Sequence, residues 1–260
     1  MRECISLLLI SAAQTRAHSP DARGFALARR RFCTHLTNAL AFVRCAHEVL
    51  KGFDLHTVTR SWLTVMNQPL HHGNPSARLR AALDIGTSPD PRHLDALLQR
   101  CAVEPDFQVR EMLTWALIRL PASSTVPRLI DQVRTGGALA RSQALHTLSK
   151  MKDPSGWQVI TEPLISDSDD EVARSAWRAA VVLVPAGSEG LLATMLSTQL
   201  GRGGHDVQRS LSRALVALGS VIEPMLLHAA SSTDATVRAH AQATEALLRD
   251  PDAGFAVFEA

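Results

Sequence analysis

The chain has 260 residues, of which 46% are hydrophobic, 20% are charged and 4% are aromatic, and it contains no Tyr. This apolar content is too high for a disordered chain, and the scattered charges argue against a membrane-spanning one. Four Cys without a Cys-x-x-Cys pair argue against a disulfide scaffold or a zinc finger. The length allows one or two compact domains, or one elongated array of repeats.

Charge divides the chain near residue 65. Residues 1–65 hold nine Lys or Arg and four Asp or Glu, a net charge of +5. The other 18 Lys or Arg and 21 Asp or Glu give residues 66–260 a net charge of −3. We therefore treat residues 1–65 as a separate N-terminal basic segment. Its run of three arginines, Arg29 to Arg31, fits a solvated basic turn of helix, and three arginines alone argue only weakly for nucleic-acid binding.

A polar stretch, residues 66–75, follows this segment and begins with Met66. We interpret it as a linker to the regular part of the chain, residues 76–260. A second interpretation is that Met66 is the natural start and that residues 1–65 are a non-native extension. Both interpretations remain open at the level of sequence.

A helical pattern recurs from residue 79 onward at spacings of 30, 31, 32, 35 and 30 residues. Each unit has an anchor residue, a second buried position four residues later and a small residue seven later. This spacing is the buried stripe of a helix, and the small residue lets a neighbouring helix approach closely. The anchors are Leu79, Val109, Ala140, Val172, Val207 and Val237. The positions four residues later are Leu83, Leu113, Ala144, Ala176, Leu211 and Ala241.

A second helix is predicted between successive anchors. The apolar runs are residues 93–101, 126–133, 157–165, 191–200 and 221–229, and a Ser precedes four of them as a candidate N-cap. These candidate caps are Ser124, Ser155, Ser188 and Ser220. Two helices in each unit of about 30 residues indicate an all-α solenoid, in which each unit is stabilised by its neighbours.

Segments such as 104–110 and 169–174 resemble HEAT repeats, and the short period resembles the subtype found in phycobiliprotein lyases. The resemblance covers residues 76–250 and implies a right-handed α-α superhelix of about six helical pairs. It also implies that the helices beginning at the anchors line the concave face. Recurring acid–Arg spacings, such as Asp106/Arg110, Asp170/Arg174 and Asp234/Arg238, predict turn-capping and inter-repeat hydrogen bonds. At the C-terminus, we expect Phe255 or Phe258 to cap the last repeat.

The repeat register also predicts which residues face outward from the anchor helices. Positions two and six residues after each anchor lie one turn apart on a shared helix face. The candidate partner-binding residues at these positions are Glu111, Trp115, His146, Arg174, Arg178, Arg209 and Arg213. One interpretation is a ligand groove, since Arg forks suit carboxylates and phosphates. The alternative is that Trp115 packs in the core and that the arginines tie adjacent repeats together.

No catalytic motif, metal-ligand spacing or cofactor-binding motif is recognisable in the sequence, so we predict a non-enzymatic scaffold or adaptor that binds a protein or peptide. A nucleic-acid backbone is a disfavoured alternative, because residues 66–260 are net acidic. A lyase-type HEAT protein acting on a chromophore or a protein is the third class. We expect no membrane contact and a cytoplasmic protein, and the sequence leaves its partner and oligomeric state open.

Overall fold

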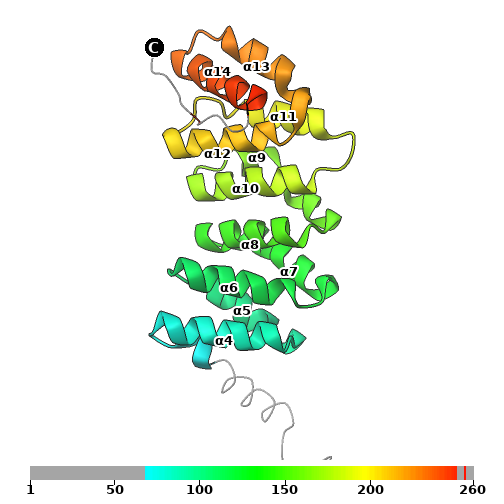
Figure 1. Cartoon of the computed structure of the whole chain (residues 1–260). Helices are drawn as coiled ribbons and strands as arrows, with labels where there is room; N and C mark the ends of the chain where they lie inside the picture. The colour runs from blue at the N-terminus through cyan, green and yellow to red at the C-terminus, as the bar shows by residue number, and fades with distance from the viewer. Residues whose placement is uncertain (1–67, 251–254, 256–260) are drawn as a thin grey trace, which may run out of the picture. The chain divides into compact units, whose positions relative to one another are not determined.

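The computed structural model describes residues 68–250 and Phe255 (Figure 1). It divides the chain into two units, Met1–Trp62 and Leu63–Ala260, and every described residue belongs to the second. The predictions for residues 1–65 and for Phe258 lie outside the described residues.

The described part is a helical solenoid of two layers, and it contains no β-strand. The first layer, called here the anchor layer, consists of α4 (Pro75–Thr87), α6 (Phe107–Ile118), α8 (Ala138–Met151), α10 (Asp170–Leu183), α12 (His205–Val216) and α14 (Ala235–Arg249). The second, the back layer, consists of α5 (Leu94–Cys101), α7 (Ala122–Thr135), α9 (Glu162–Ile165), α11 (Glu189–Ser197) and α13 (Glu223–Ala230). Figure 1 shows the anchor-layer helices stacked in chain order, each contacting the next.

Four short 3-10 helices connect or extend these elements. They are η1 (Gln68–His71), η2 (Pro91–His93), η3 (Pro154–Val159) and η4 (Gly219–Ile222). Although η1 falls within the predicted polar linker, its Leu70 is fully buried and η1 contacts α4 and α5. Part of that linker is therefore packed against the first repeat.

The predicted anchors and small residues lie on the anchor layer and form most of its buried stripe. Val109, Val172 and the Ala or Thr residues seven positions after them are fully buried. Ala176 and Trp177 are also fully buried, and the Trp177 indole Nε1 donates to the Ile165 carbonyl at 2.9 Å. Trp177 is thus a core residue, as its position one place off the outward-facing register predicts.

The register predicted for the first repeat is wrong. Leu83 is 40% exposed, whereas Arg78, Ala82 and Ile85 are buried, so the buried stripe of α4 begins one residue earlier than Leu79. Arg78 lies four residues after its N-cap, as Arg110 does in the next repeat, and each donates to the carbonyls five and six residues earlier. A pattern of apolar residues could not identify Arg78, because a charged side chain at a core position depends on a partner from another repeat.

The back layer is less regular than its apolar runs suggest. Residues 157–165 do not form one helix, since η3 ends at Val159 and α9 begins only at Glu162, directly before Pro163. The Ser caps are mostly wrong as well. Ser188 alone of the four occupies an N-cap, without a capping hydrogen bond, and Ser124 lies inside α7. Ahead of the back-layer helices, the capping side chains are Asp90 at η2 and Asp153 at η3. The anchor-layer helices α4, α6, α10 and α14 are capped by Asn74, Asp106, Asp169 and Asp234.

The partner that admits Arg78 to the core is Glu104, which is 0% exposed. Its carboxylate accepts two hydrogen bonds from the Arg78 guanidinium at 2.7 Å, one from Arg100 Nε at 2.7 Å and one from the backbone N–H of Asp106 at 2.9 Å. Burial alone raises the pKa of Glu104, but these donors outweigh it and hold the pKa at about 2. One carboxylate therefore connects α4, α5 and the start of α6.

An equivalent contact recurs further along the chain. Arg141 of α8 donates to the Asp167 carboxylate, and both acid–Arg pairs are separated by 26 residues. Each acid also accepts from the backbone N–H two residues later, at the N-cap of the next anchor-layer helix. We call the Arg78–Glu104 and Arg141–Asp167 pairs the repeat locks, because each joins one anchor-layer helix to the turn that begins the next.

The predicted acid–Arg hydrogen bonds are found at two of the three four-residue spacings. Asp106 and Asp234 cap α6 and α14, while Arg110 and Arg238 each donate to the carbonyls five and six residues earlier. In α10 the capping residue is Asp169, one residue before the predicted Asp170.

The last repeat contains a buried histidine. His240 is 0% exposed, and its Nδ1 accepts from the Gly201 backbone N–H at 3.0 Å. The hydrogen therefore resides on Nε2, which donates to the Gln208 carbonyl at 3.0 Å. Burial lowers the pKa of His240 to about 4. The Phe255 ring lies 6.0 Å from the His240 ring of α14 and 5.4 Å from the His205 ring of α12, so it contacts the junction of these two helices.

Among the described helices, no single one has the length and apolar character needed to cross a bilayer. One pair, α12 with η4–α13, meets these criteria only when joined across a bend of 120°.

Replacing Arg78 with Ala tests the first repeat lock. We expect Arg78→Ala to lower the free energy of unfolding by about 3 kcal/mol, because it removes the bidentate donor from a buried carboxylate. Chemical denaturation monitored by circular dichroism measures the change. Arg92→Ala is the control, since Arg92 forms a pair in which its own side chain is 72% exposed. Equal effects of the two variants would contradict the assignment of Arg78 as a lock.

His240 predicts a loss of stability in mild acid. The folded-state pKa is about 4, whereas an unfolded chain has a His pKa of about 6.5. The unfolded state thus binds the proton first, and stability should fall as the pH drops from about 6.5 to about 4. Thermal melts across this range measure the slope, which should be shallower in His240→Gln. An unchanged slope in that variant would show that His240 is not the responsible group.

Candidate functional site

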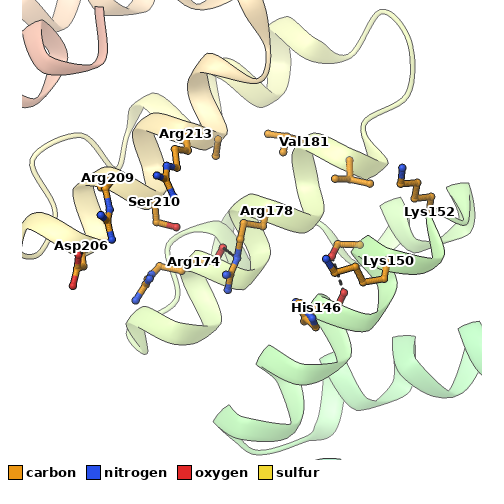
Figure 2. A pocket seen from close by; sticks show the side chains of 13 residues that line it. His146, Lys150, Lys152, Arg174, Arg178, Val181, Asp206, Arg209, Ser210 and Arg213 are labelled. Carbon is orange, nitrogen blue, oxygen red and sulfur yellow. Dashed lines mark hydrogen bonds and ion pairs between the residues drawn. The ribbon is translucent and has the colours of Figure 1, made fainter. Parts of the chain in front are cut away.

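A groove of about 480 Å³ lies on the anchor layer across α8, α10 and α12 (Figure 2). Six Lys or Arg side chains line it, together with His146, several small or apolar residues and one carboxylate, that of Asp206. We call it the cationic groove. Its positively charged residues are Lys150, Lys152, Arg174, Arg178, Arg209 and Arg213.

Two of these arginines are neutralised by acids of their own helices. Arg174 Nη1 lies 2.7 Å from Glu171 Oε1, and Arg209 Nη2 lies 3.0 Å from Asp206 Oδ1. Both pairs are three residues apart, so each forms on one turn of a single helix. Neither arginine ties adjacent repeats together through its ion pair.

The arginines one turn further along have no ion pair with a described residue. Arg178 is exposed and hydrogen-bonds only within α10, to the Arg174 carbonyl at 3.2 Å and to Ser175 Oγ at 3.0 Å. The pKa of Arg178 is below its ordinary value. Partial burial is the main cause, and the positive charge of Arg174 adds to it. Arg213 is exposed and makes no hydrogen bond or ion pair with a described residue.

Two lysines extend this uncompensated charge to the end of α8. Lys150 and Lys152 are exposed, and neither makes a hydrogen bond or ion pair with a residue that the structure describes. Lys152 is the C-cap of α8 and has a φ of 55°, the left-handed conformation. This conformation is strained for a residue with a side chain, and Gly is the usual residue at such a helix end.

His146 lies at the edge of the groove towards α6. Its Nε2 is 3.2 Å from Glu111 Oε1, so a residue of α6 meets one of α8 here. Burial is the main cause that lowers the pKa of His146; Glu111 opposes the shift, and Lys150 and Arg178 add to it. His146 is therefore neutral near pH 7, and Lys150 and Arg178 are close enough to act on its charge.

Trp115 and Glu111 do not line the cationic groove. Trp115 is half-buried against Gly86, where an added Cβ would meet the indole ring at 2.1 Å. Arg119 covers the ring, with its guanidinium carbon 5.3 Å from the centroid. Trp115 is thus engaged in packing α6 against α4, as the second interpretation of the sequence expected for this residue.

The structure therefore brings five of the seven predicted residues together around one groove: His146, Arg174, Arg178, Arg209 and Arg213. Sequence reasoning missed Lys152, Ser210 and the apolar pair Val181 and Val182. Pro154 signals the end of α8, but no pattern of residue types specifies that Lys152 adopts a left-handed conformation at the groove.

The described residues offer no second chemical centre. They contain no group of three or more His, Cys, Asp or Glu side chains that could hold a metal ion. Cys101 is buried, and this burial raises the pKa of its thiol to about 12, which disfavours the reactive thiolate.

Comparison with protein-family models matches residues 94–181 to HEAT repeats. The chain contains HEAT repeats. The matched range runs from the start of α5 into α10 and includes α8, which contributes one wall of the cationic groove. Comparison with curated proteins finds no match.

Replacing Lys152 with Gly tests whether the Lys side chain at the left-handed end of α8 contributes to the stability of the fold. We expect Lys152→Gly to raise the free energy of unfolding by about 1 kcal/mol, because Gly adopts a positive φ without strain. The same variant removes one positive charge from the groove. Denaturation curves of Lys152→Gly, with Gly137→Ala as a control at a helix start with open space around it, measure the gain. A loss of stability in Lys152→Gly would mean that the Lys side chain serves the fold.

Proposed function

We propose that this HEAT-repeat chain is a non-enzymatic binding module that holds an acidic segment of a partner protein in the cationic groove. HEAT repeats generally mediate protein interaction, and the match over residues 94–181 supports this class of function. The observation that carries the proposal is the set of unpaired cations on three consecutive anchor-layer helices.

The distribution of charge supports a partner-binding rather than a structural role for these side chains. Inter-repeat ion pairs in this solenoid each join an Arg to an acid of another repeat, as the buried Arg78–Glu104 and the more exposed Arg202–Asp170 do. Arg178 and Arg213, by contrast, are exposed and contribute no ion pair to the fold among the described residues. Keeping like charges close together costs electrostatic energy, which a bound anionic segment would recover.

A nucleic-acid backbone fits the groove less well. The unpaired cations that line the groove lie on α8, α10 and α12, whereas the corresponding positions of α14 are Ala239 and Ala243. Residues 66–260 also carry a net charge of −3, which opposes the long-range attraction that backbone binding requires. A lyase activity lacks an observation that favours it, because no catalytic constellation accompanies the groove in the described residues.

A pair of double variants tests the proposal in the source cell. Proximity labelling or cross-linking with the full chain should capture a partner, and Arg178→Ala/Arg213→Ala should reduce that capture about tenfold or more. The control is Arg128→Ala/Arg134→Ala, which removes the same charge from exposed residues of α7 in the back layer.

Capture of the same partner by both double variants at the level of the wild type would contradict binding in the cationic groove. Loss of capture in both variants would indicate dependence on overall charge rather than on this site.

A further inference from the structure

The cationic groove contains two classes of positive charge, and the difference between them indicates its ligand. Glu171 forms an ion pair with Arg174, and Asp206 forms one with Arg209. No carboxylate of the described residues forms an ion pair with Lys150, Arg178 or Arg213, although all three line the same groove. The cations without an ion pair therefore lie close together, on three neighbouring helices.

We propose that the anion completing this groove is a phosphorylated Ser or Thr side chain of the partner protein, held by Lys150, Arg178 and Arg213. This inference rests on the proposed function and narrows it from an acidic segment to a phosphorylated one. A phosphate monoester carries nearly two negative charges near neutral pH and three acceptor oxygens, so it can engage several cations at once. A single carboxylate occupies one guanidinium fork and would leave the other cations unpaired.

The remaining donors in the groove suit the same ligand. Arg178 uses Nε and Nη2 within α10 and keeps Nη1 uncommitted, while all the guanidinium donors of Arg213 are uncommitted with respect to the described residues. Ser210 lies between Arg209 and the next turn of α12, lines the groove and makes no side-chain hydrogen bond with a described residue. Figure 2 shows the Arg178, Arg213 and Ser210 side chains extending into the groove from two adjacent helices.

The limited extent of the charge favours a short peptide segment over a long polyanion. Adjacent packed helices are about 8–10 Å apart, so the three contributing helices span about 20 Å, roughly six residues of extended chain. On the α14 side, the row ends at Ala239 and Ala243, and on α6 the corresponding residues are Glu111 and Trp115, with Arg119 over the Trp115 ring. A nucleic-acid strand or a membrane surface would extend beyond the groove and would meet no cation at these two positions of α14.

The test uses the full chain and three matched peptide libraries. Each library has random flanking positions and a central residue that is phosphoserine, Ser or Glu. Binding is measured by fluorescence anisotropy at about 150 mM salt, where weak surface attraction is screened. We expect the phosphoserine library to bind about tenfold or more tightly than the Glu library. Arg178→Ala/Arg213→Ala should abolish the difference, whereas the Arg128→Ala/Arg134→Ala control should retain it.

Three results would overturn the inference. Equal binding of the Glu and phosphoserine libraries would do so, but would leave the proposed acidic partner intact. Equal and weak binding of all three libraries would do so as well, and the cross-linking experiment would then decide the proposed function separately. Tighter binding of a single-stranded oligonucleotide or of vesicles containing phosphatidylserine would assign the groove to a different class of macromolecule.

Discussion

The arrangement of the solenoid depends on the carboxylate of Glu104, which is completely buried. Glu104 is tolerated in the core because four hydrogen bonds replace its hydration, and those bonds come from α4, α5 and the turn that begins α6. Bidentate geometry restricts both the distance and the rotation of Arg78 relative to this turn. Asp167 repeats the arrangement between α8 and the start of α10. These charged hydrogen bonds are directional, so they fix the position of one helix relative to its neighbour. Apolar contacts alone would let the packed helices slide past each other.

The same constraint explains why the outward-facing residues form a continuous surface. The locks fix α4 relative to α6 and α8 relative to α10, and Arg202 joins the turn before α12 to Asp170 of α10, so residues at equivalent positions align across these repeats. The groove on α8, α10 and α12 follows from that alignment, with its charges provided by residues that the locks do not use. Arginines therefore have two separate roles in this chain. Arg78 and Arg141 are buried or half-buried and stabilise the stacking, while Arg178 and Arg213 are exposed and available to a ligand.

Much of this architecture could be predicted from the sequence, since periodicity reports burial and the predicted register holds in five of the six anchor-layer helices. The failures have physical causes. The first repeat was misaligned because its core position is the charged Arg78, whose burial depends on Glu104, 26 residues away. The sequence left two interpretations of Trp115 open, because spacing cannot show that Gly86 leaves room for its ring. The cluster of arginines could be predicted because it depends only on the repeat register. Lys152 could not, because it reaches the groove from a left-handed helix end that no pattern of residue types specifies.

The central claim is that Arg178 and Arg213 serve a ligand and not the fold, and the stability of the unliganded chain tests it directly. Replacing both with Met keeps side-chain length and apolar contact while removing the like charges. The account predicts that Arg178→Met/Arg213→Met is at least as stable as the wild type at low salt. Any gain should shrink as salt screens the repulsion in the wild type. A variant less stable than the wild type at every salt concentration would contradict the account, because it would place these arginines among the residues that hold the repeats together.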